Sequence, residues 1–202
     1  MRIKSQWFNA AKAKTPQETA GAMAFITWRV GQNMLKQMRT ADFDIDIGRH
    51  YFIFTREVLA FLMHVLDRMA HARMASDERT AFTTALVLRM ADILQENEDI
   101  HLGERATDTV GYRDEFIALF NESGAEYADF ACDANGPEFA FVRYFGHRVE
   151  ALMPQKDRPW VVDQLMAIEV PEALKTLQRG MDGVLSTEPR APRRGHALAG
   201  GD

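Results

Sequence analysis

The stretch YFIFTREVLAFLMHVLDRMAHARM, residues 51–74, decides the fold of this chain. Placed on a helix at about 100° per residue, its side chains are apolar over well more than half of the circumference. A surface helix needs an apolar stripe only ~100° wide. The sequence therefore predicts a central helix near residues 49–75, with neighbouring helices packed on several of its sides.

The polar side chains of this helix gather on one narrow face. Six of them fall within roughly a third of the circumference, and we call them the polar stripe: Arg56, Glu57, His64, Asp67, Arg68 and His71. Charges of both signs alternate along it, which is typical of a solvent-exposed face with weak ion pairs. The sequence favours that interpretation, with a buried polar network and a metal-binding or catalytic site as alternatives.

Four members of the polar stripe are candidate metal ligands. His64, Asp67 and His71 are spaced three and four residues apart, so that their side chains can face one point. A carboxylate beside an imidazole raises its basicity and fixes its tautomer, which metal binding and general-base catalysis both use. Glu57 extends the same line. The sequence thus nominates Glu57, His64, Asp67 and His71 for a metal, but no catalytic residue and no particular cofactor.

A calcium-binding pattern begins in the connection that precedes the central helix. Asp42, Asp44 and Asp46 occupy alternate positions, as at the start of an EF-hand loop. The match then fails, since Ile47 stands at the glycine position and Ile53 at the position of the closing glutamate. The sequence favours a connecting loop whose aspartates cap the next helix.

Two other features that could carry chemistry stand further along the chain, a Glu-x-x-His pair and a cysteine. Glu98, with His101 three residues later, matches one half of the carboxylate di-iron signature, which requires that motif on two helices plus two further glutamates. Cys132 is the only cysteine, and its aromatic neighbours favour a small core residue. A single cysteine excludes an internal disulfide and is consistent with a cytoplasmic location.

The rest of the chain is also helical by its apolar spacing. Further helices are predicted over residues 16–39, 76–99, 110–132, 137–153, 158–168 and 171–185. The fold class is therefore all-α, a single-domain bundle of six to seven helices within residues 1–185. Residues 1–14 form either a short packed arm or a loose one. Residues 186–202 are rich in proline, glycine and alanine, and are predicted to be a disordered tail.

Composition excludes two classes of partner. The formal net charge of −5 argues against binding nucleic acid, which needs a basic face. No window reaches the ~20 apolar residues of a transmembrane helix, so a membrane partner is not expected. Nucleotide-binding glycine loops and nucleophile motifs are missing from the sequence as well. A protein partner or a small apolar ligand stays open.

These observations lead to two functional expectations. The first is a non-catalytic cytoplasmic protein that works by association, most simply as a homodimer. Its basis is surplus apolar surface, because Phe25, Trp28 and Leu35 spread hydrophobicity around the first helix in addition to the central one. The alternative is a helical bundle that binds a metal or a small molecule through the polar stripe.

Overall fold

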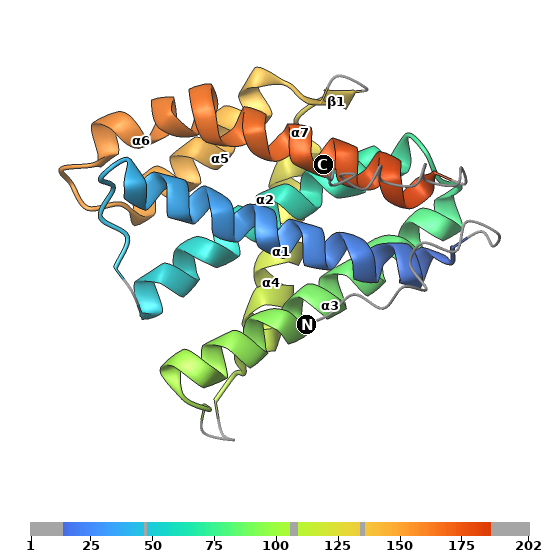
Figure 1. Ribbon diagram of the computed structural model, residues 1–202, viewed down its shortest axis with the longest axis horizontal. Helices are drawn as coiled ribbons and strands as arrows, with labels where there is room; N and C mark the ends of the chain where they lie inside the picture. Colours follow the sequence, from blue (N-terminus) through green and yellow to red (C-terminus); the bar gives the residue numbers. More distant parts are fainter. Residues whose placement is uncertain (1–13, 47, 106–108, 134–135, 187–202) are drawn as a thin grey trace, which may run out of the picture.

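The computed structural model describes residues 14–46, 48–105, 109–133 and 136–186. In these residues the chain forms seven α-helices, one π-helical segment and one minimal strand pair (Figure 1). In chain order they are α1 (Pro16–Thr40), α2 (Arg49–His71), α3 (Ser76–Leu102), α4 (Tyr112–Ala128), β1 (Cys132–Asp133), β2 (Gly136–Pro137), α5 (Phe139–Leu152), α6 (Arg158–Gln164), η2 (Leu165–Glu169) and α7 (Val170–Leu185). The predicted all-α bundle is confirmed. The predicted arm and tail lie, except for residues 14 and 186, outside the described residues.

The central position of α2 is confirmed. It contacts α1, α3, α4, α5 and both short strands, and it crosses behind α1 in Figure 1. Its large apolar side chains are buried almost throughout, with Ile53 the exception at 38% exposure. Gly31 of α1 permits a close approach to this helix, since a Cβ there would lie 2.9 Å from Cδ2 of Leu59. α2 is thus enclosed by its own chain.

This enclosure corrects the reason given above for self-association. The apolar surplus of α2 is covered by its own neighbours. Leu35 of α1 is fully buried, and Trp28 packs half-buried against the core. The central helix and Leu35 therefore offer no association surface, whereas Phe25 and Trp28 stay partly exposed.

Local sequence signals explain where several helices begin and end. α1 starts with a capping box: the Glu18 amide donates to Oγ1 of Thr15 at 3.1 Å, and the Thr15 amide donates to Oε2 of Glu18 at 2.8 Å. The short connection after α2 returns the chain as α3, so the two helices run antiparallel (Figure 1). No helix in the described part of the chain is long and apolar enough to span a membrane.

The last two predicted helices are joined rather than separated. We expected a break before Pro171, but α6 continues into α7 through the π-helical segment η2. There the Val170 amide donates to the Leu165 carbonyl, one residue further back than in an α-helix. Pro171, which has no backbone N–H to donate, lies directly after this π turn in the first turn of α7, where the helix continues without a break. α4 is also shorter than expected and ends at Ala128, ahead of the β1–β2 pair.

Candidate functional site

The polar stripe of α2 does not form the solvated face that the sequence favoured. Arg56 and Glu57 have side chains only 12% exposed, and His64 is 7% exposed. Of the six stripe residues, only His71 at the end of the helix is exposed. The reason for the correction is that α3, α4 and α5 carry polar partners that face this stripe, which the pattern of α2 alone does not reveal. The buried-network alternative describes it best.

Arg56 joins three helices. Its guanidinium lies 2.7 Å from Oε1 of Glu98 on α3 and 2.6 Å from Oε2 of Glu115 on α4. Arg105 closes the cluster with a second ion pair to Glu115 at 2.9 Å. The Glu98 side chain is 1% exposed, and burial raises the pKa of this carboxyl although Arg56 opposes the shift. Two guanidinium groups thus balance two carboxylates where α2, α3 and α4 meet.

Glu57 is held by α5. Arg148 donates from Nε and Nη2 to the two carboxylate oxygens of Glu57, at 2.7 and 2.8 Å. Its third nitrogen, Nη1, reaches Oε2 of Glu126 on α4 at 2.8 Å. A paired geometry of this kind is specific as well as strong. Glu57 therefore already has a cation that occupies both oxygens.

His64 sits in an aromatic pocket. Its ring stacks on Phe120 with centroids 4.3 Å apart, and its Nε2 lies 2.9 Å from Oγ of Ser123. The Ser123 hydroxyl also lies 3.3 Å from the Phe120 carbonyl oxygen. Burial lowers the pKa of His64 to about 4, so the ring is neutral at pH 7. Ser123 is 1% exposed, and a nucleophilic role would require access that this position lacks.

The third and fourth candidate ligands have partners of their own. Arg79 and Thr83 of α3 donate to the Asp67 carboxylate, at 2.9 and 2.7 Å to Oδ1. Burial alone would raise the pKa of Asp67, but these donors outweigh it and lower the pKa. His71 is exposed, with Nδ1 3.4 Å from Nη1 of the same Arg79.

The structure therefore does not bring the four candidate metal ligands together. Glu57 faces α5, His64 faces α4, and Asp67 faces α3. Across the described ranges, no group of three or more histidine, cysteine, aspartate or glutamate side chains has an arrangement that could hold a metal ion. Glu98 and His101 also separate, since Glu98 is buried against Arg56 whereas His101 is exposed beside Phe52.

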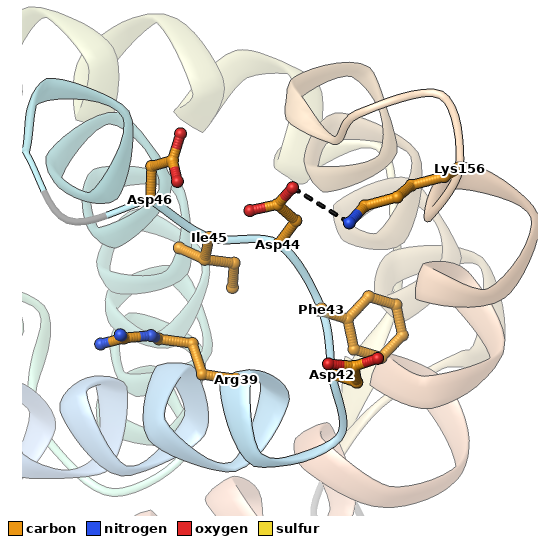
Figure 2. Close-up of a pocket in the computed structure, with 7 residues that line it drawn as sticks. All are labelled: Arg39, Asp42, Phe43, Asp44, Ile45, Asp46 and Lys156. Carbon is orange, nitrogen blue, oxygen red and sulfur yellow. Dashed lines mark ion pairs between the residues drawn. The ribbon is translucent and has the colours of Figure 1, made fainter.

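The loop that resembled a calcium site lines a polar cavity of about 460 Å³ (Figure 2). Its three carboxylates point in different directions in this view. Asp44 pairs with Nζ of Lys156 at 3.1 Å, and its amide donates to Oδ2 of Asp157 at 2.8 Å. Asp42 has a φ of +68°, which reverses the chain after α1. The loop thus acts as a connection, as the sequence favoured, but the expected capping by its aspartates is wrong: the N-cap of α2 is Gly48, and no side chain among the described residues caps this helix.

A second, more apolar cavity opens between α5 and α7. We call it the α5–α7 groove; it measures about 620 Å³ and is lined by Pro137, Phe139, Val142, Met166, Val170, Pro171, Leu174, Lys175, Gln178 and Arg179. Phe139 is 67% exposed at its edge. Two cations, Lys175 and Arg179, lie one helical turn apart on α7. The groove combines an apolar floor with a cationic rim.

Sequence reasoning missed the partners of the stripe and the whole groove. The small residues Ser123 and Gly124 interrupt the apolar spacing of α4, which was a usable sequence signal that a side chain from another helix packs there. A Cβ at Gly124 would lie 3.4 Å from Cε1 of His64. For the groove there was no local signal, because it arises between segments distant in sequence. A scan against protein-family models found no match, and searches of curated proteins and of solved structures returned no similar protein.

Proposed function

We propose that this chain is a non-catalytic protein that works by self-association, and that the α5–α7 groove is where the second copy binds. The observation that carries the proposal is an open, mostly apolar groove on a molecule whose central helix is covered by other helices of the same chain. Its edge residue Phe139 is 67% exposed. Full burial of such a side chain stabilises by about 1.5–3 kcal/mol.

The state of the polar stripe supports a role in folding rather than in chemistry. Glu57, His64 and Asp67 each bind another side chain of the same chain, in three different directions. A ligand would have to displace these partners. The groove needs no such displacement, since its floor residues Met166 and Leu174 are only partly covered. Association at the groove is therefore the function that the geometry supports best.

The test is sedimentation velocity of the full chain across nanomolar to micromolar concentration. We expect the 22.9 kDa chain to double in mass with rising concentration. Phe139→Ser should weaken the dimer about tenfold, in proportion to the apolar area that it removes from the interface.

The matched control is Ile100→Ser. Ile100 is 78% exposed on α3, and its substitution should leave the dissociation constant unchanged. A wild-type chain that stays monomeric throughout would overturn the proposal. Equal weakening by both substitutions would show that the dimer uses another surface.

A further inference from the structure

The α5–α7 groove has the dimensions of a small-molecule site. Its volume of about 620 Å³ lies within the range of roughly 300–1,000 Å³ that such sites have in proteins. The side formed by η2 and α7 is lined from Met166 to Arg179, which at 1.5 Å per residue is a length of roughly 20 Å. The groove is therefore long enough to take an extended chain.

The floor of the groove is apolar and continuous with the core. Val170 and Val142 are 1% and 8% exposed, and Met166 and Leu174 are partly buried against the core. No ion pair in the described part of the chain involves a residue that lines the groove. An alkyl chain could therefore lie on this floor without breaking any such pair.

The rim of the groove carries two cations and no anion. Lys175 and Arg179 are exposed and lie four residues apart on α7. Like charges at this spacing repel each other, and Glu172, the nearest acid on the same helix, forms no ion pair with either of them. A carboxylate between the two cations replaces repulsion by two attractions, and a guanidinium can hold both of its oxygens.

An apolar floor beside two cations is complementary to a molecule with one alkyl chain and one carboxylate. We infer that the α5–α7 groove binds a free amphipathic carboxylate of the fatty-acid type, with its chain along the floor and its carboxylate between Lys175 and Arg179. Such a ligand covers the same apolar surface as the second copy, so it acts as a competitor that dissociates the dimer. This effect on association, unlike the binding itself, rests on the self-association proposed above.

A series of chain lengths tests the binding. Microscale thermophoresis of the labelled chain at nanomolar concentration, with octanoate, decanoate or dodecanoate below micelle-forming concentrations, should show one saturable site. Each buried CH₂ group raises affinity about fourfold, so two further groups should raise it about tenfold. Decyltrimethylammonium, which has the same chain length as decanoate but a cationic head group, should bind about tenfold more weakly than decanoate.

Neutralising the rim tests the position of the carboxylate. Lys175→Gln with Arg179→Gln should weaken decanoate binding about fivefold, since each exposed ion pair is weak, and should not weaken the binding of decyltrimethylammonium. The matched control is Lys36→Gln with Arg39→Gln, which removes an exposed lysine and arginine three residues apart on α1 and should have no effect. Equal affinity for both head groups, or equal weakening by the control, would overturn the site.

The outcomes separate this ligand from the proposed self-association. In sedimentation velocity, saturating decanoate should return the dimer to monomer, and a dimer that persists would overturn the competition. A dimer that Phe139→Ser weakens, in a chain that binds no decanoate, would overturn the ligand and leave self-association intact. Saturable, rim-dependent binding to a chain that is monomeric at every concentration would support the ligand and overturn self-association.

Discussion

The polar stripe of α2 and the α5–α7 groove contrast in both chemistry and access. The stripe holds the side chains best suited to catalysis or metal binding, yet most of them are buried and paired with α3, α4 and α5. The groove holds mostly apolar side chains without any motif, yet it is open and its edge residue Phe139 is largely exposed. Residue type alone would rank the two surfaces in the opposite order.

The contrast shows what a charged stripe on a central helix is for. Arg56 pairs with α3 and α4, Glu57 with α5 and Asp67 with α3, so the stripe fixes the angle and register of three helices around α2. Buried ion pairs add little net stability over apolar packing, but removing one partner is costly because the other stays buried and charged. The residues that line the groove form no such buried ion pairs with other helices in the described part of the chain.

The largest effect is expected at the Arg56 cluster. Arg56→Met should lower the free energy of unfolding by about 3–5 kcal/mol at pH 7, because Glu98 stays buried without its cation. Urea denaturation measures the loss. Adding Glu98→Gln should recover part of it, whereas the exposed substitution Lys36→Met should change stability by less than about 0.5 kcal/mol. A loss below about 1 kcal/mol for Arg56→Met would contradict the role of this cluster.

The next effect is a pH dependence from His64. The unfolded chain binds a proton at this imidazole near pH 6.5, but the folded chain binds it only near pH 4. Stability contributed by the neutral ring is therefore complete above pH 6.5 and falls by on the order of 3 kcal/mol as pH drops to 4. His64→Leu should flatten the curve of unfolding free energy across this window. The exposed His71→Leu is the control, and equal slopes in both variants would refute the assignment.

A smaller effect distinguishes the two surfaces by stability alone. Phe139→Ser should change the unfolding free energy of the dilute, monomeric chain by less than about 0.5 kcal/mol, because the ring is already in solvent. Phe145→Ala, which removes a buried ring stacked 4.1 Å from Phe61, should cost about 3–5 kcal/mol. Thermal or urea unfolding of both variants checks this. A large loss for Phe139→Ser would mean that the groove edge belongs to the core.

The smallest expected effect concerns metals. Added Zn²⁺, Mn²⁺ or Fe²⁺ should shift the melting temperature by less than about 1 °C, since Glu57, His64 and Asp67 bind partners on three different helices and the guanidinium of Arg79 lies between Asp67 and His71. Saturating binding would raise it by several degrees. A rise of that size, lost in His64→Ala or His71→Ala, would support the metal site that the sequence nominated.

Sequence reasoning predicts the helices better than it predicts their surroundings. The Thr15 cap and the wide apolar arc of α2 are local signals, and both predictions are confirmed. The predicted break before Pro171 is wrong because a π-helical turn directly before this proline joins the two helices. The apolar spacing of the sequence does not indicate such a turn. The stripe misled because its exposure is decided by Glu98, Ser123 and Arg148 on other helices. Those contacts exist only once the bundle has formed.

Hydroxyl-radical footprinting of the full chain at two concentrations, one below and one above the dissociation constant, tests most directly whether a second copy covers the groove. Phe139 and Met166 should lose reactivity as concentration rises, whereas Trp160 on α6 and Ile100 on α3 should stay equally reactive. Protection confined to the groove residues is the predicted result. Unchanged reactivity at Phe139 and Met166, or protection that appears at Trp160 or Ile100 instead, would contradict it.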